Sequence, residues 1–148
     1  MIDFVDVPLI SPNCQRIQEW DGKTWRLLDS WRIRFKTDEY CYELMLPKGF
    51  VTDFGSIPRA FRRLWTPMGP YLVGYLTHDG LYGGELVARA EADYILCSLL
   101  EDFGANWVDR NAQYSGVRAG GWLVWSEHKA EEVAAIRESC VFYRGALA

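Results

Sequence analysis

The sequence has little of what marks a metal ribbon, a membrane protein or a non-specific nucleic-acid binder. Its 148 residues include four cysteines, none of them paired in a CxxC motif, which argues against a zinc ribbon or a thioredoxin-type redox motif. No apolar run approaches the roughly 18 residues of a membrane span. Lys and Arg number 16 against 20 Asp and Glu, so we predict no nucleic-acid partner.

The first six residues, Met1 to Asp6, include acidic side chains at the place where a signal peptide needs positively charged ones. We therefore expect the protein to act in the cytoplasm of the cell that makes it, with reduced thiols. The length suits one domain spanning residues 1–148. Aromatic residues make up 15% of the chain, enough to dominate the core and to leave some exposed rings, which often mark a binding face.

The first half of the chain has the period of strands and the second half the period of helices. Large apolar residues alternate with basic ones in Trp31-Arg32-Ile33-Arg34-Phe35, the pattern of a half-exposed strand. We predict an α+β fold in which an N-terminal antiparallel hairpin or meander is followed by four to five helices packed on it. The predicted strands are 25–27, 31–35 and 40–46, and the predicted helices are 58–65, 71–82, 88–103, one within 106–125, and 127–139 capped by Ser126.

A segment with interleaved polar and apolar residues joins the two halves, from Thr52 to Arg59. Its apolar side chains should pin it against the core and hold Thr52, Asp53 and Ser56 in fixed positions, as loops with functional residues often do. The same Asp and Ser could instead satisfy backbone N–H groups at a turn and a helix start.

The predicted helix 71–82 places an acid on its apolar stripe. Leu72, Tyr75, Leu76 and Asp79 follow the i, i+3, i+4, i+7 spacing, so Asp79 should face the core, where a carboxylate needs a partner. His78 lies one position round the helix. A buried Asp beside a His suits a site that shifts pKa values or holds a ligand, and it equally suits a structural network that ties helices together.

Arg89 and Asp93 stand four residues apart on the next predicted helix. This spacing fits an exposed ion pair worth only about 0.3–0.5 kcal/mol. If that face is buried, Arg89 or Asp93 could instead reach Asp79 or His78 and form one charged cluster.

These residues belong to longer motifs spread over about residues 44–121. The motifs are Gly49-Phe50-Val51-Thr52-Asp53-Phe54-Gly55-Ser56-Ile57-Pro58-Arg59, His78-Asp79-Gly80-Leu81-Tyr82, Arg89 with Ala92-Asp93, and Tyr114 with Val117-Arg118. Together they resemble a family of uncharacterised phage and prophage proteins catalogued as domain of unknown function 1353, which usually has alanine at the position of Gly55. The resemblance implies a phage or prophage origin and supplies no reaction. It singles out Thr52, Asp53, Ser56, His78, Asp79, Tyr82, Arg89 and Asp93.

Two kinds of chemistry could use these residues. His78, Asp79 and Asp53, with Asp93 nearby, could bind a divalent metal, and this oxygen-rich set suits Mg, Mn or Fe better than structural zinc. A serine hydrolase would set Ser56 against His78, with Asp53 or Asp93 orienting the imidazole. Asp79 is a poor orienter because adjacent helical side chains diverge by about 100°.

The leading hypothesis is a phage-encoded hydrolase with Asp53, Ser56, His78 and Asp79 as catalytic residues. Thr52, Tyr82, Arg89 and Asp93 would then bind substrate or support the site. The alternative is a non-catalytic virion, tail-assembly or host-interaction protein in which the same residues form a structural cluster. Its partner would be a phage or host protein, and it would act in the infected or lysogenic bacterium or within a virion.

Overall fold

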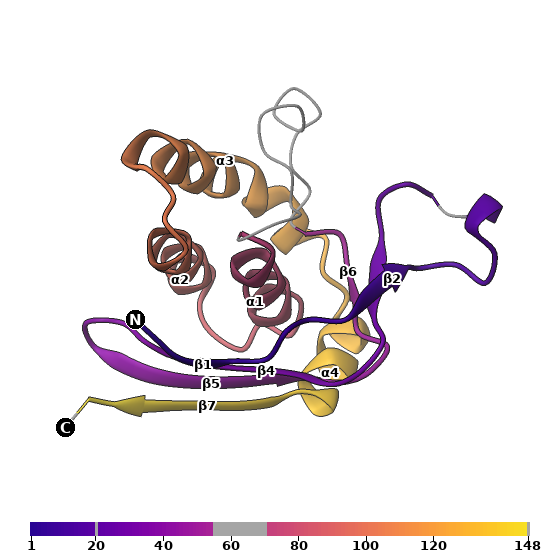
Figure 1. The fold of residues 1–148 in the computed structure, drawn as a ribbon, viewed down its shortest axis with the longest axis horizontal. Coiled ribbons are helices and arrows are strands. Elements are labelled where there is room, and N and C mark those ends of the chain that lie inside the picture. The colour runs from indigo at the N-terminus through magenta and orange to yellow at the C-terminus, as the bar shows by residue number, and fades with distance from the viewer. Residues whose placement is uncertain (20, 55–70, 148) are drawn as a thin grey trace.

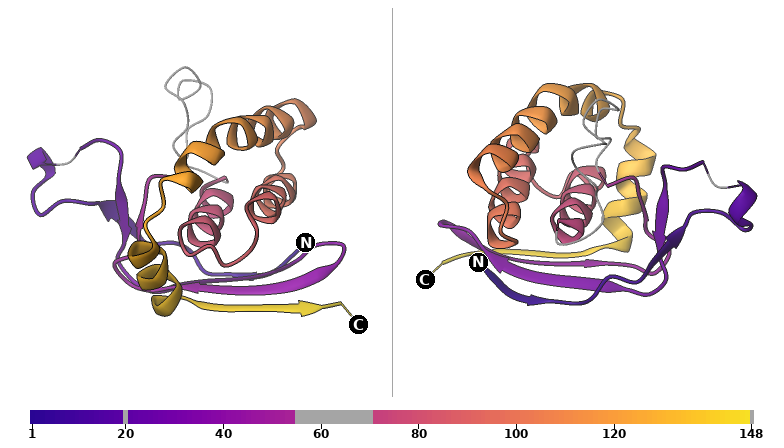
Figure 2. Two further views of the ribbon diagram at one scale, coloured as in Figure 1. Left: turned by 180° about the vertical axis from the view of Figure 1, so that it is seen from behind. Right: turned by 45° about the horizontal axis from the view of Figure 1, so that its top comes forward.

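The computed structural model describes residues 1–19, 21–54 and 71–147. A sheet forms one layer, helices α1 and α2 lie on one of its faces, and α3 crosses them on the side away from the sheet (Figure 1). Figure 2 shows the same three layers from two further directions, with α4 at one end of the sheet. The predicted α+β fold is therefore confirmed: most strands precede the helices, and one further strand follows them at the C-terminal end.

The larger sheet has four antiparallel strands in the order β1-β4-β5-β7. Two of them, β4 and β5, are the strands that the sequence predicted, whereas β1 and β7 were not predicted. The chain's C-terminal strand, β7, pairs with β5 from Tyr40 to Met45. The strand bounds are β1 Ile2–Val5, β4 Trp31–Lys36, β5 Tyr40–Leu46 and β7 Val141–Ala146.

The alternation along β4 decides which face of this sheet meets the helices. Trp31, Ile33 and Phe35 are buried, whereas the basic residues between them are exposed, as a period of two requires. Opposite them on β5, Leu44 pairs with Ile33 and is fully buried. One continuous core cluster joins these side chains to the inner faces of α1 and α2.

A smaller antiparallel sheet, in the order β2-β3-β6, lies beside the main one. Its strands are β2 Ile10–Pro12, β3 Trp25–Leu27 and β6 Val51–Thr52, and a short 3-10 turn, Ile17–Glu19, lies between the first two. A turn at Asp21-Gly22 precedes β3, and in it Asp21 Oδ1 accepts the backbone N–H groups of Lys23 and Thr24. Strand β6 brings Thr52 and Asp53 to the edge of the helical layer.

The described residues contain four α-helices, α1 Leu72–Gly83, α2 Arg89–Asp102, α3 Trp107–Ser126 and α4 Ala130–Ser139. Three match the predicted segments closely. Gly104 follows α2 with a φ of +84°, the left-handed conformation in which a glycine often ends a helix. The predicted cap at Ser126 is wrong, because the Ser126 hydroxyl donates to the carbonyl of Leu123 and α4 begins only at Ala130. The predicted helix 58–65 lies outside the described residues. No helix in the described ranges is long and apolar enough to cross a membrane.

Helix α1 packs against β5 through a glycine. A Cβ added at Gly80 would lie 2.6 Å from Leu46 Cδ2, whereas one added at Gly120 of α3 would meet no described atom within 4 Å. Both glycines are inside helices, so both Ala variants gain about 1 kcal/mol of helix propensity.

We predict that Gly120→Ala stabilises the protein by about 1 kcal/mol and that Gly80→Ala is less stable than Gly120→Ala by about 1–3 kcal/mol, because only the Gly80 methyl overpacks the core. Urea unfolding of the two variants measures this difference. Equal stability of the two variants would contradict the close α1–β5 packing.

Candidate functional site

Helix α1 brings two adjacent polar residues into the space between the helical layers. His78 is 5% exposed, and the side chain of Asp79 is 13% exposed. Tyr75 and Leu76, on the same stripe as Asp79, are buried in the core. The prediction that Asp79 faces inward is therefore confirmed, but His78 lies deeper than Asp79.

The deepest charged group is Asp93 on α2, whose side chain is 0% exposed. Its Oδ1 lies 2.9 Å from His78 Nε2, and its Oδ2 lies 3.0 Å from Nη1 of Arg118 on α3. Arg89 Nη1 lies 3.7 Å from the same Oδ2 and donates to the carbonyl of Arg118. Arg89 and Asp93 thus form part of one charged cluster across three helices, the second of the two predicted arrangements.

The partners of Asp93 decide its charge. Burial by itself would raise the pKa of Asp93, but the hydrogen bonds from His78 and Arg118 outweigh it and hold the pKa below its usual value of 3.8. Asp93 is therefore ionised at neutral pH and accepts hydrogen bonds only. Because it accepts only, the Nε2 of His78 must carry a proton and donate it to Asp93.

The other imidazole nitrogen of His78 has a different environment. Nδ1 is buried and has no hydrogen-bond partner among the described residues. It lies 3.9 Å from Asp79 Oδ1, too far for a hydrogen bond. Burial by itself would lower the pKa of His78, but Asp79 and Asp93 together raise it above 6.5. The two carboxylates therefore stabilise the imidazolium relative to that of a free histidine.

Strand β6 connects the sheet to this cluster through Thr52. The Thr52 hydroxyl donates to Asp79 Oδ2 and accepts the backbone N–H of Phe54 at 3.0 Å. Phe54 has a φ of +56° and is fully buried, so the chain turns sharply here and leaves Asp53 exposed between two buried residues. The predicted site residue Ser56 lies outside the described residues.

Tyr82 covers one face of the His78 ring. The two rings stack with centroids 4.8 Å apart, and the Tyr82 hydroxyl donates to the carbonyl of Gly121 at 2.6 Å. Trp125 of α3 packs edge-on against Tyr82, also at 4.8 Å. Tyr82 therefore fixes the plane of the imidazole and links α1 to the second half of α3, as its place among the predicted residues suggested.

Three further residues complete the cluster and were absent from the predicted site. Arg118 binds Asp93, and it belongs to the Val117-Arg118 motif, so a signal for it was present. The Tyr75 hydroxyl donates to Oε1 of Gln113, which is buried on α3. Tyr75 lies one turn before Asp79, and burial followed by the charge of Asp79 raises its pKa. Sequence spacing indicated Tyr75 as a core residue, and nothing in the sequence marked Gln113.

The described residues hold no group of three or more His, Cys, Asp or Glu side chains placed to bind a metal ion. Asp53 is exposed, whereas His78 and Asp79 are nearly buried. The structure thus brings together Thr52, His78, Asp79, Tyr82, Arg89 and Asp93, and metal binding by His78, Asp79 and Asp53 stays a prediction that this geometry does not support.

The raised pKa of His78 predicts a pH dependence of stability. The folded protein binds this proton more tightly than the unfolded chain, so the stabilisation is fully present below the ordinary pKa of 6.5. It is lost as pH rises through the raised pKa of the folded state. We predict that the free energy of unfolding falls between about pH 6.5 and the raised value, and that His78→Gln removes this fall.

Urea unfolding of wild type and His78→Gln at half-unit steps above pH 6 measures the effect. A second limb at acid pH comes from the lowered pKa of Asp93, with stability lost as pH falls through that value, and His78→Gln should reduce this limb because His78 is one of the two donors that lower it. A wild-type stability that rises above pH 6.5 would contradict the assignment.

Comparison with known proteins gives one match. The family described as "Protein of unknown function (DUF1353)" matches residues 25–117, a span that starts before the predicted region of 44–121 and includes β3 to most of α3. No curated protein matches the chain, and no solved structure matches it. The matched span contains every member of the cluster from Thr52 to Gln113, and Arg118 follows it directly. The chain belongs to the DUF1353 family.

Proposed function

We propose that this protein is a small hydrolase in which His78, oriented by Asp93, transfers the proton that the hydrolysis requires. One observation supports the proposal most: Nε2 of His78 is bound to a fully buried carboxylate, while Nδ1 has no hydrogen-bond partner among the described residues. Buried polar atoms are nearly always satisfied, so a buried nitrogen without a partner needs an explanation. Proton exchange between Nδ1 and a substrate or a water would explain it, because an imidazole both accepts and donates protons near neutral pH.

Each charged partner has a part in this chemistry. Asp93 fixes the ring and stabilises the imidazolium, as the carboxylate of a Ser-His-Asp triad does. Arg118 and Arg89 keep Asp93 ionised. The neutral imidazole, whose Nε2 proton is held by Asp93, takes a proton at Nδ1 as the general base, and the imidazolium so formed then returns that proton to the leaving group as the general acid.

Asp79 is the carboxylate on the Nδ1 side of His78. Its side chain is 13% exposed and accepts a hydrogen bond from Thr52, so a substrate at Nδ1 would lie beside it. Asp53 lies exposed at the end of β6, where it can contact a ligand. Ser56 remains the predicted nucleophile, by its place in the motif that contains Thr52 and Asp53.

The second candidate is a non-catalytic virion, tail-assembly or host-interaction protein. The complete burial of Asp93 favours it, because a sealed carboxylate with cations from two other helices also serves as a structural clamp. In either case we propose a phage or prophage origin, which the family resemblance implies. The bacterial cytoplasm, or a virion, is then the proposed location, and a phage or host protein the proposed partner.

The hydrolase proposal predicts that His78→Gln loses activity while it keeps the fold. Purified protein is assayed on p-nitrophenyl acetate, p-nitrophenyl phosphate, bis(p-nitrophenyl) phosphate and a peptide p-nitroanilide. We expect wild type to hydrolyse at least one substrate, and His78→Gln to be slower by a factor of about 10²–10⁴, the usual contribution of general acid–base catalysis.

Tyr42→Phe is the matched control, because it removes one hydrogen bond of a buried residue, to Glu91, at the main sheet. It should retain wild-type rates. Asp93→Asn provides a second variant that keeps the side-chain shape if His78→Gln fails to fold. No hydrolysis by wild type, or equal rates in folded wild type and His78→Gln, would favour the structural clamp.

A further inference from the structure

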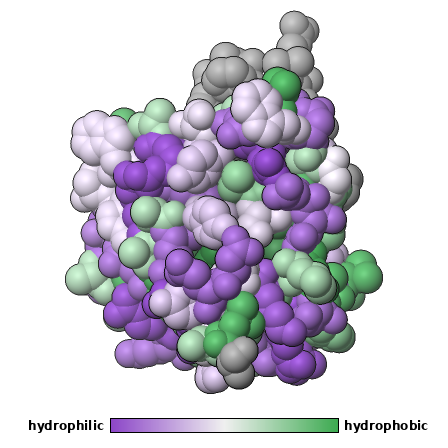
Figure 3. Space-filling view, turned by 90° about the vertical axis from the view of Figure 1, so that its left-hand side faces the viewer, coloured by the Kyte–Doolittle hydropathy of each residue, from purple (hydrophilic) through white to green (hydrophobic). Residues whose placement is uncertain are grey.

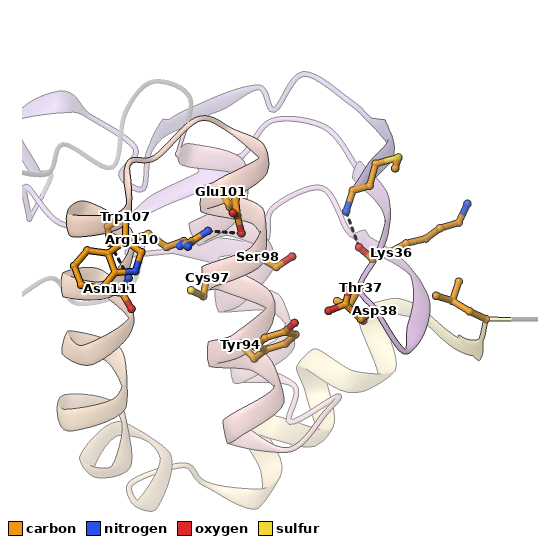
Figure 4. A pocket seen from close by; sticks show the side chains of 12 residues that line it. Lys36, Thr37, Asp38, Tyr94, Cys97, Ser98, Glu101, Trp107, Arg110 and Asn111 are labelled. Carbon is orange, nitrogen blue, oxygen red and sulfur yellow. Dashed lines mark hydrogen bonds and ion pairs between the residues drawn. The ribbon is translucent and has the colours of Figure 1, made fainter.

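A groove separate from the charged cluster crosses the outer side of α2. It has a volume of about 510 Å³ and runs from the turn between β4 and β5, at Thr37 and Asp38, to the first turns of α3. Figure 4 shows the side chains of Tyr94, Cys97, Ser98 and Glu101 of α2 between these two walls. This volume falls in the range of small-molecule sites, and no described member of the charged cluster lines it.

Two aromatic rings in this groove are exposed. Trp107 is 70% exposed and Tyr94 is 48% exposed, although burying such rings would be favourable. The view of this side in Figure 3 shows hydrophobic residues in small groups among hydrophilic ones. The rings therefore belong to a mixed polar surface and not to a continuous apolar patch of the kind that docks another protein.

The backbone that carries Trp107 is held firmly. Asn106 caps α3 by accepting the N–H of Asp109 at 2.9 Å, and the Asn111 amide donates to the carbonyl of Trp107 at 2.7 Å. Such bonds reduce the ordering that a ligand must supply on binding. The backbone position from which the Trp107 ring extends is thus fixed at one end of the groove.

The charges of the groove are matched. Arg110 pairs with Glu101, and Lys36 pairs with Asp3 at 3.0 Å. Asp38, which also lines the groove, is exposed. No excess of positive charge is left among these residues to attract a phosphate or a carboxylate. A neutral ligand with hydroxyl groups fits better, because Asp38 accepts hydrogen bonds and the Ser98 hydroxyl both donates and accepts.

The thiol in the groove does not indicate covalent chemistry. Burial raises the pKa of Cys97 above its ordinary value of 9.0, so the thiol stays protonated and is a poor nucleophile at neutral pH. The groove has the parts of a binding site and not those of a second catalytic centre.

We propose that this groove binds a neutral saccharide. The pyranose C–H face would pack on Trp107 or Tyr94, and the ring hydroxyls would hydrogen-bond to Asp38, Ser98 and Asn111. Apolar ring faces beside carboxylate, hydroxyl and amide groups match the two kinds of surface that a sugar presents.

The test uses glucose, galactose and N-acetylglucosamine as probes on the full chain. Each sugar is titrated while two sets of signals are followed by ¹H–¹⁵N NMR: the indole N–H signals of the seven Trp residues, and the backbone amide signals of Ser98 and Asn111 in the groove, which report binding when Trp107 is replaced. We expect at least one sugar to shift the Trp107 signal saturably, with a dissociation constant on the order of 1 mM. Trp107→Ala should weaken that binding about tenfold or more.

Trp122→Ala is the matched control, because Trp122 is an exposed Trp of the same helix, 56% exposed, that does not line the groove. It should bind as wild type does. The proposal is overturned if no sugar shifts the Trp107 signal, if Trp107→Ala binds with wild-type affinity, or if citrate or the peptide Gly-Trp-Gly shifts that signal and the sugars do not.

Discussion

The ionised carboxylate of Asp93 has no exposure to water, so the packing of the helices around it must compensate its charge. A charge in that position costs several kcal/mol unless cations and hydrogen bonds replace the lost water. His78 supplies one partner from α1, Arg118 supplies another from α3, and Arg89 adds a third from α2 itself. The three helices must therefore pack in one relative arrangement, since any other leaves the charge uncompensated.

The same requirement extends to the sheet through His78. Its ring is fixed by Asp93 on one edge and by Tyr82 on one face, so Nδ1 points to the side on which Asp79 lies. Thr52 holds Asp79 from strand β6. Proton chemistry and packing thus use the same contacts, which explains why a hydrolase and a structural clamp are the two functions this cluster supports.

Much of the fold could be predicted from the sequence because it depends on the spacing of apolar residues within each helix or strand. The alternation of Trp31 to Phe35 predicted β4, and the spacing of Asp79 predicted its inward face. The features that the sequence did not predict depend on contacts between segments that are far apart in the sequence. Strand β7 has no clear alternation, and it forms a strand because β5 offers it an edge. The role of Gln113 arises only where α3 crosses α1 beside Tyr75. The sequence left open whether Asp53 or Asp93 would lie against His78, and only the fold places Asp93 Oδ1 2.9 Å from Nε2.

The central claim is that Asp93 binds a protonated Nε2 and leaves Nδ1 of His78 open to exchange its proton. The side-chain ¹⁵N shifts of His78 through a pH titration measure this directly. The expected result is a neutral form protonated at Nε2, with Nδ1 taking up its proton at a pKa above 6.5. A neutral form protonated at Nδ1, or a His78 pKa below 6.5, would contradict the claim.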